Sequence, residues 1–463
     1  MFRPPLLILF FLQCLTVLVS AGERPNVLFI AVDDLRPEID CYGLGKMVTP
    51  NFDRLANDGV RFDHAYCNIA VCGASRASLM KGLRPTPTRF TSYLTRADKD
   101  APNAVSLPMT FKQNGYVTMS NGKVYHHRND DAEAWSRPAW HPNRSSAWWA
   151  LPENRPEEGA KKRGPAYEIA DISDEEYPDA MICEKTIEDL RQLSNGDSPF
   201  FLACGFYRPH LPFNAPKKYW DLYPETEVKL PNNMYFPQGL SSAFQYSWGE
   251  MRAYRGIPNK GPVSDETARN LIRGYHACVS FIDVQVGRLL DELEQLGIAD
   301  NTIVILWGDH GWQLGEHDFW CKHTNFEVAT RTPLFLSAPR MKGGRVCEAL
   351  VEYVDIYPTL CDLAGLDKPK HLQGLSMMPL LTDVDAKFKE QVITRHGGGD
   401  SIRTPNFRYM EMRTKNGAGE LKGVGLFDLK KDPLENQDVS TDPEYREVLH
   451  RLRQKLREAE KAM

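Results

Sequence analysis

The chain has 463 residues, and its 56 Lys and Arg against 61 Asp and Glu give a formal net charge of −5. This length exceeds one average domain and allows a large hydrophobic core with a second, smaller domain. General nucleic-acid binders usually carry a clear basic excess, so the composition argues against a nucleic-acid partner. It does not exclude a small anionic substrate, because a local basic pocket can lie in an acidic protein.

The first residues have the pattern of a secretory signal peptide. Arg3 precedes an apolar run over residues 6–19, and Val-Ser-Ala at 19–21 fits a small-residue cleavage site. The run is short for a membrane-spanning helix, and an uncleaved anchor is the alternative interpretation. We therefore expect removal of residues 1–21, no stable membrane insertion, and a secreted or periplasmic protein, or a lysosomal one in a eukaryote.

Four apolar, β-branched runs each lead into polar residues. The runs and the side chains that follow are 26–32 with Asp33 and Asp34, 116–120 with Lys123 and His126, 199–204 with Arg208 and His210, and 302–307 with Asp309 and His310. Continuous apolar runs predict strands that are buried on both faces of a parallel sheet. Because ligands bind outside the carboxyl ends of such strands, we expect the polar endings to share one crevice.

Helical patterns lie between these runs and set the fold class. They cover residues 179–193 and 265–296, and a shorter pattern at 77–81 stops at Gly82. Strands that alternate with helices predict an α/β fold.

The pattern changes near residue 380. Short strands are expected at the end of the chain over 391–394, 407–412 and 425–429, followed by an amphipathic helix over 445–462. We expect a catalytic domain over residues 22–378 and a smaller α+β domain over residues 379–463.

Three carboxylates would meet in the predicted crevice. Asp33, Asp34 and Asp309 would repel one another there unless a cation held them, and hard oxygen ligands suit Ca²⁺ or Mg²⁺. The alternative for the Asp33–Asp34 pair is a turn or a helix cap. The matching Asp309-His310 after a second strand favours the metal site.

The same crevice would also gather more positive charge than three carboxylates and a metal require. The basic side chains are Arg76, Lys123, His126, His210 and Lys322. The surplus indicates a multiply charged anion, and a tetrahedral oxyanion such as sulfate or phosphate fits. Taken singly, a lysine can be a surface charge, and either histidine can be a structural one.

Two further features leave alternatives open. The ten cysteines show no regular spacing and no CxxC pair; some could pair in an exported protein, and Cys72 is the candidate for another fate.

A long loop over 137–165 carries aromatic side chains that could stack on sugar rings or simply pack against the protein: Trp140, His141, Trp148 and Trp149.

The segment Cys72-Gly73-Ala74-Ser75-Arg76 resembles the type I sulfatase signature Cys-x-Pro-x-Arg, with alanine in place of the usual proline. Other segments resemble the family's metal, lysine–histidine and C-terminal motifs: 26–34, 122–126, 308–333 and 425–433. Asp309-His310, the spacing from Lys123 to His126 and the segment 207–213 are most similar to the iduronate-2-sulfatase branch.

The resemblance implies an alkaline-phosphatase-like sandwich, with a large, mostly parallel sheet between helices and a smaller C-terminal α+β domain. It implies that a dedicated maturation enzyme oxidises Cys72 to formylglycine. It also implies a bound Ca²⁺, with Mg²⁺ as the alternative. The implied metal ligands are Asp33, Asp34, residue 72, Asp309 and His310. The implied catalytic residues are Cys72, Arg76, Lys123, His126, His210, Asp309 and Lys322.

The implied activity is hydrolysis of sulfate esters on a carbohydrate, such as a polysaccharide or a glycosaminoglycan fragment. In this scheme Asp309 accepts a proton from the hydrated formylglycine, and Lys322 and His210 lie on the leaving side. Lys123 holds sulfate oxygens and His126 assists sulfate release. Two alternatives remain: a phosphomonoester or phosphonate hydrolase of the same superfamily, and a non-catalytic, exported glycan-binding protein.

Overall fold

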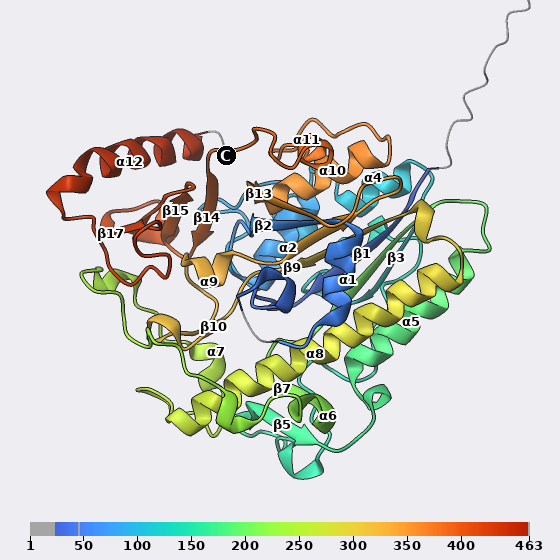
Figure 1. The fold of residues 1–463 in the computed structure, drawn as a ribbon, viewed down its shortest axis with the longest axis horizontal. Coiled ribbons are helices and arrows are strands. Elements are labelled where there is room, and N and C mark those ends of the chain that lie inside the picture. Colours follow the sequence, from blue (N-terminus) through green and yellow to red (C-terminus); the bar gives the residue numbers. More distant parts are fainter. Residues whose placement is uncertain (1–23, 45–46, 462–463) are drawn as a thin grey trace, which may run out of the picture.

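The computed structural model of the chain describes residues 24–44 and 47–461, so the expected signal peptide lies outside the described residues. A seven-stranded sheet with strand order β13-β2-β12-β9-β1-β6-β3 forms the centre of the molecule. A separate four-stranded sheet, ordered β14-β15-β16-β17, forms the C-terminal part (Figure 1). This arrangement confirms the α/β sandwich with a smaller C-terminal domain.

The four predicted strands lie side by side in the large sheet. They are β1 (Asn26–Val32), β3 (Val117–Gly122), β6 (Phe200–Phe206) and β9 (Thr302–Gly308). β1 pairs in parallel with β6 and β9, and β6 pairs in parallel with β3. Their carboxyl ends therefore lie at one edge of the sheet, as their continuous apolar sequences predict.

Three further strands extend the sheet beyond the sequence prediction. They are β2 (Val60–Tyr66), β12 (Leu334–Ser337) and β13 (Arg345–Glu352). β12 runs antiparallel to both of its neighbours, so the sheet is mostly parallel. β2 and β13 contain polar residues between the apolar ones, and this pattern gives a weaker strand signal than a continuous apolar run.

Helices cover both faces of the sheet because successive side chains of a strand point to opposite faces. One face packs against α1 (Pro50–Asp58), α5 (Pro178–Leu193) and α8 (Asp265–Gln295). The other packs against α2 (Cys72–Lys81), α4 (Leu107–Gln113) and α10 (Ile356–Leu363). In β1, Leu28 and Ile30 belong to the first core, and Val27 and Phe29 to the second.

Shorter elements connect these layers. The helices are α3 (Ala97–Asp100), α6 (Lys217–Trp220), α7 (Gly249–Arg252), α9 (Glu327–Thr330) and α11 (Met378–Thr382). The strand pairs are β4 (Arg163–Pro165) with β8 (Tyr254–Arg255), β5 (Tyr167–Ala170) with β7 (Phe213–Pro216), and β10 (Gln313–Leu314) with β11 (Trp320–Cys321).

The C-terminal domain is an antiparallel sheet covered by one helix. Its elements are β14 (Val392–His396), β15 (Gly399–Arg403), β16 (Phe407–Arg413), β17 (Leu421–Asp428) and α12 (Arg446–Lys461). Leu452 and Leu456 of α12 are buried against this sheet. The predicted boundary at residues 378 and 379 falls at the start of α11, whose Leu380 and Leu381 pack into the core of the larger domain. The boundary itself stays a prediction.

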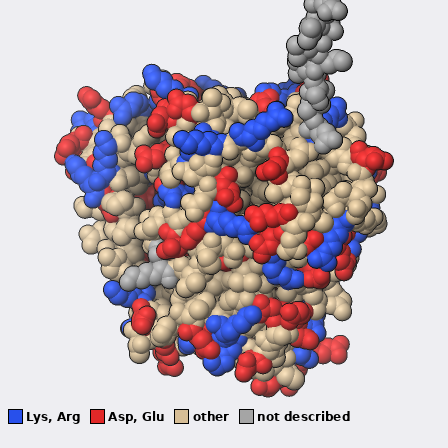
Figure 2. Space-filling model, turned by 45° about the vertical axis from the view of Figure 1, so that its right-hand side comes forward, with Lys and Arg blue, Asp and Glu red and all other residues tan. Residues whose placement is uncertain are grey.

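The surface and the cysteines complete the description. On the face drawn in Figure 2, Lys and Arg side chains are interspersed with Asp and Glu. Within residues 24–44 and 47–461, no helix combines the length and apolar character needed to cross a membrane. Cysteine pairing, expected as an option from the sequence, is absent among the described residues, where nine cysteines are free: Cys41, Cys67, Cys72, Cys183, Cys204, Cys278, Cys321, Cys347 and Cys361.

Candidate active site

The first acidic residues of the site follow β1 directly. Asp33 and Asp34 are both fully buried. The backbone N–H of Asp34 donates a hydrogen bond to Oδ1 of Asp309 at 2.9 Å, which ties the end of β1 to the end of β9. The Tyr275 hydroxyl donates to the Asp34 carbonyl at 2.7 Å. These hydrogen bonds hold the ends of β1 and β9 together without the help of a ligand.

Helix α2 brings Cys72 and Arg76 to the same place. The helix begins at Cys72, which is 3 % exposed, and ends at Lys81; the next residue, Gly82, has a φ of 63°, which suits the left-handed cap that glycine favours. The guanidinium of Arg76 donates to Oδ2 of Asp309 at 2.8 Å and to Oδ1 of Asp33 at 3.1 Å. It also donates to the backbone carbonyl of Lys123.

Arg76 therefore acts on the protein's own groups. Its side chain is fully buried, and its hydrogen bonds go to the two carboxylates and to the backbone carbonyls of Lys123 and Val124. Sequence reasoning places this arginine in the crevice as part of the charge that meets an anion. In the structure it orients the acidic residues that a cation would bind.

Lys123 enters the site from the end of β3. Its Nζ forms an ion pair with Asp33, and its backbone N–H donates to the Gly205 carbonyl at 2.7 Å. A Cβ at Gly205 would lie 2.1 Å from the carbonyl carbon of Lys123, so only glycine allows the two chains to pass this closely. Burial raises the pKa of the Cys72 thiol, but the positive charges of Lys123 and Lys322 outweigh it and hold that pKa well below its usual value.

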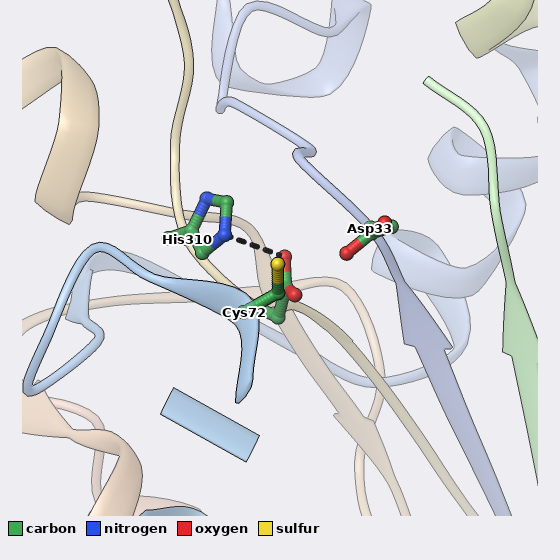
Figure 3. A group of neighbouring side chains, drawn as sticks. Asp33, Cys72 and His310 are labelled. Atoms are coloured by element: carbon green, nitrogen blue, oxygen red, sulfur yellow. Dashed lines mark ion pairs between the residues drawn. The ribbon is translucent and has the colours of Figure 1, made fainter. Parts of the chain in front are cut away.

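Four buried side chains offer their ligand atoms to a common space. Atoms of Asp33, Cys72, Asp309 and His310 all lie within 4.8 Å of one another. Figure 3 shows Asp33, Cys72 and His310 pointing toward this space from the end of β1, the start of α2 and the loop after β9. Asp34 is adjacent, with Oδ1 3.4 Å from Nε2 of His310.

The unsatisfied atoms of this group fit a divalent cation. Oδ1 of Asp34 and Nε2 of His310 are buried and make no hydrogen bond within the described part of the chain. Buried polar atoms without a partner are rare in native proteins. Burial, with a smaller contribution from the charge of Asp33, raises the pKa of Asp34 to about 7, although Lys322 and His210 oppose the shift. Several carboxylate oxygens and one imidazole match the ligand preferences of a divalent metal ion.

The remaining basic side chains surround Cys72 from two sides. His126 interacts with the Cys72 thiol and contributes to the lowered pKa of that thiol. On the other side, Nζ of Lys322 lies 3.2 Å from Oδ2 of Asp34, and Nε2 of His210 lies 3.9 Å from the same oxygen. The structure thus brings together all the residues that the sequence analysis singled out for the site.

Glu250 is a member of the site that sequence reasoning missed. It lies in α7 and contacts both Lys322 and His210. The segment that carries it follows no strand of the large sheet and shows no regular apolar period. The signal used for the other acids, a carboxylate directly after a buried strand, could not have found it.

Two tryptophans of the long loop have structural roles. Trp149 is buried, and its Nε1 donates to the Pro165 carbonyl at 3.0 Å. The Trp148 ring contacts the Tyr177 ring edge-on, at 5.2 Å between centroids, and the Arg144 guanidinium lies 4.5 Å from its centroid. For these two side chains the packing alternative describes the structure better than sugar stacking does.

Comparison with known proteins identifies the family. Residues 25–366 match the family model described as Sulfatase, and residues 315–462 match the model described as N-sulphoglucosamine sulphohydrolase, C-terminal. Iduronate 2-sulfatase of Mus musculus is 32 % identical over 94 % of this chain and 94 % of its own. Iduronate 2-sulfatase of Homo sapiens is 36 % identical over 76 % of this chain and 70 % of its own.

Solved structures show the same fold at lower identity. A protein solved in complex with its substrate D-glucosamine-2-N,6-O-disulfate has a TM-score of 0.74 at 24 % identity, covering 95 % of this chain and 98 % of that one. A phosphonate monoester hydrolase from Silicibacter pomeroyi has a TM-score of 0.78 at 23 % identity, covering 95 % and 96 %. The family match and the two curated relatives confirm the resemblance found in the sequence: the chain belongs to the sulfatase family, as a type I sulfatase close to the iduronate 2-sulfatase branch, and is a sulfuric ester hydrolase.

Proposed function

We propose that the chain hydrolyses sulfate esters on a carbohydrate, with a sulfated uronic acid of a glycosaminoglycan or another polysaccharide as the substrate class. The observation that carries this proposal is the buried acidic cluster around Cys72 faced by the basic side chains Lys123, His126, His210 and Lys322. The two iduronate 2-sulfatase relatives support the choice of sugar.

Oxidation of Cys72 to formylglycine by a maturation enzyme is part of the proposal. Hydrated formylglycine would supply the hydroxyl oxygen that attacks sulfur. The surroundings suit that chemistry, because Lys123 and Lys322 already favour negative charge on the side chain at position 72. Its place at the first residue of α2 adds the favourable end of the helix dipole. Ala74 stands where the family signature has proline, and we propose that maturation tolerates it.

A divalent cation, Ca²⁺ with Mg²⁺ as the alternative, would be held by Asp33, Asp34, Asp309 and His310. When bound, it would supply positive charge that polarises a sulfate oxygen and favours ionisation of the attacking hydroxyl. Arg76 keeps two of these carboxylates in place through its hydrogen bonds to Asp33 and Asp309.

The protein's own groups would hold the sulfate and move the protons. Lys123 would bind sulfate oxygens, and Asp309 would accept the proton of the attacking hydroxyl. Lys322 and His210 would lie on the leaving side, where one of them would protonate the departing sugar oxygen, and His126 would accept a proton when sulfate is released. As in phosphoryl transfer, positioning and charge stabilisation would provide most of the rate enhancement.

The experiment is a direct measurement of sulfate release. The protein is co-expressed with a formylglycine-generating enzyme and incubated with a panel of sulfated disaccharides, in parallel with aryl sulfate, aryl phosphate and a phosphonate monoester. Ion chromatography measures free sulfate and phosphate, and mass spectrometry of the peptide across Cys72 measures aldehyde content. Sulfate release that rises with aldehyde content supports the proposal.

Two other outcomes would favour the alternatives. Faster turnover of the phosphate or phosphonate ester would favour a phosphomonoester or phosphonate hydrolase. The phosphonate monoester hydrolase from Silicibacter pomeroyi has the same fold as this chain. Sugar binding without sulfate release by aldehyde-containing protein would favour a non-catalytic glycan-binding protein. Export after cleavage near residue 21 is a separate proposal, and N-terminal sequencing of the mature protein tests it.

A further inference from the structure

Glu250 places a carboxylate among the basic groups on one side of the site. Its Oε1 lies 2.9 Å from Nζ of Lys322 and 2.9 Å from Nε2 of His210. Its Oε2 lies 2.8 Å from Lys322 and 3.3 Å from Nε2 of His323. One carboxylate therefore joins side chains from the loop after β6 and from the segment after β11.

The backbone that carries Glu250 is well supported. Its neighbour Met251 is fully buried, and the backbone N–H of Met251 donates to the Trp248 carbonyl at 3.2 Å. The guanidinium of Arg252 stacks on the Trp248 ring, 3.4 Å from its centroid. The Glu250 side chain, 18 % exposed, thus projects from a packed turn toward the site.

Lys322 makes a second metal ion at this place unnecessary. Asp34, His210 and Glu250 offer ligand atoms within 4.8 Å of one another, which by itself would suit a cation. Nζ of Lys322 already lies 3.2 Å from Asp34 and 2.8 Å from Glu250. Its ammonium charge neutralises these carboxylates and would repel a metal ion.

The surroundings of Lys322 also restrict where its ammonium can go. The Trp312 ring lies 4.7 Å from Nζ on a third side. Without Glu250, Asp34 would be the remaining carboxylate partner of Lys322. The lysine would then be drawn toward a residue that the proposed function assigns to the metal.

We propose that Glu250 is a positioning residue that holds Lys322 and His210 together on the side where the sugar oxygen departs. The inference rests on the proposed function. As sulfur bonds to the attacking oxygen of residue 72, its bond to the sugar oxygen breaks and the electron pair stays on that oxygen. The oxygen takes a proton from the Lys322 ammonium or the His210 imidazolium and leaves as a hydroxyl group.

The dependence on the leaving group separates this role from a merely structural one. A sugar alkoxide is a strong base and needs a proton as it leaves, whereas 4-nitrophenolate leaves readily without one. A group that acts through Lys322 and His210 therefore matters for a sugar sulfate and much less for 4-nitrophenyl sulfate. A group that only stabilises the fold affects both substrates equally.

The first test is E250Q, which keeps the side-chain volume and removes the charge. We expect kcat on a sulfated uronate disaccharide to fall about 100-fold, within the range of general acid catalysis, with KM nearly unchanged. On 4-nitrophenyl sulfate we expect a loss of less than about 3-fold. Equal losses on the two substrates would overturn the proposal.

Glu352 provides the matched control. It is also buried and also binds two basic side chains, Arg84 and Lys389, but it contacts none of the proposed catalytic residues. E352Q should change the two substrate rates by the same factor. If E250Q does not fold, E250D replaces it, because aspartate retains the charge and should preserve more of the rate on the sugar sulfate than E250A does.

A double-mutant cycle of E250Q with K322A, measured on the sugar substrate, tests whether Glu250 acts through Lys322. Because Glu250 acts through Lys322, E250Q should cost less than about 10-fold when Lys322 is already absent. Full additivity would contradict the proposal. If wild-type protein with confirmed aldehyde releases no sulfate from any substrate, the proposed function fails; if wild type is active and E250Q is substrate-independent, only the role of Glu250 fails.

Discussion

The site has two halves that differ in how they are built. In the half around Arg76, which belongs to helix α2, the fully buried side chains of Asp33 and Asp309 come from the ends of β1 and β9. Around Glu250, the side chains of Lys322 and His210 come from loops, and His210 remains 14 % exposed. Under the proposed function the two halves divide the work: the closed half holds the charged framework, and the half nearer solvent would meet the sugar.

Cys72 lies where the two halves meet, so its removal should have the largest effect. C72A should release no detectable sulfate, because no aldehyde can form, while its thermal melting temperature stays within a few degrees of wild type. C67A is the control: Cys67 is equally buried nearby but faces the hydrophobic core. Measurable turnover by C72A would contradict the proposed mechanism.

Removal of the cation should reduce activity nearly as much as C72A does, because the proposed metal ligands lie in the closed half of the site. Dialysis against EDTA should abolish sulfate release and lower the melting temperature, and Ca²⁺ should restore both. A ligand at 100 times its Kd stabilises the native state by about 2.7 kcal/mol. Full activity in protein shown by elemental analysis to be metal-free would exclude the cation. Restoration by Mg²⁺ but not Ca²⁺ would correct its identity.

Arg76→Ala should damage stability as well as activity, since it removes one ion-pair partner from each of two buried carboxylates, Asp33 and Asp309. Breaking a buried ion pair costs about 3–5 kcal/mol, measurable as a loss in the free energy of unfolding by urea. Arg191→Ala is the control, because Arg191 pairs with Glu292 at the surface with its side chain 57 % exposed, so its loss should change the free energy of unfolding far less. Similar losses in the free energy of unfolding for the two variants would contradict the role of Arg76 as the buried support of the closed half.

His323 should show the smallest effect. Its Nε2 lies 3.3 Å from Oε2 of Glu250, and it is not among the side chains that cluster around Cys72. H323A removes one hydrogen bond from a carboxylate that still holds Lys322 and His210, so kcat on the sugar sulfate should fall by a factor of about 2 to 10. A loss of kcat as large as that of E250Q would show that the half of the site nearer solvent depends on His323 as well.

The same division explains what the sequence could predict. β1 and β9 are buried on both faces and read as continuous apolar runs, so Asp33, Asp34 and Asp309 could be placed at one sheet edge. β15 reads Gly-Asp-Ser-Ile-Arg and is a strand because of the sheet and helix packed around it, which no local pattern reveals.

Other details required the fold. The sequence placed Arg76 in the crevice but could not show that its donors are used by Asp33, Asp309 and the Lys123 backbone. Lys322 follows the two-residue strand β11, which lies outside the large sheet, so no continuous apolar run of a parallel strand marks its position. Glu250 depends on how the loop segments fold together, and that information is not local.

The depth of Cys72 has a consequence for the life of the polypeptide. At 3 % exposure, with α2 packed between the large sheet and α10, its sulfur is beyond the reach of another protein once folding is complete. The oxidation proposed for residue 72 would therefore have to happen on the nascent chain, in competition with collapse of the core. Under that proposal, slower folding would raise the fraction of oxidised molecules, and protein that folds first would keep its thiol and stay inactive.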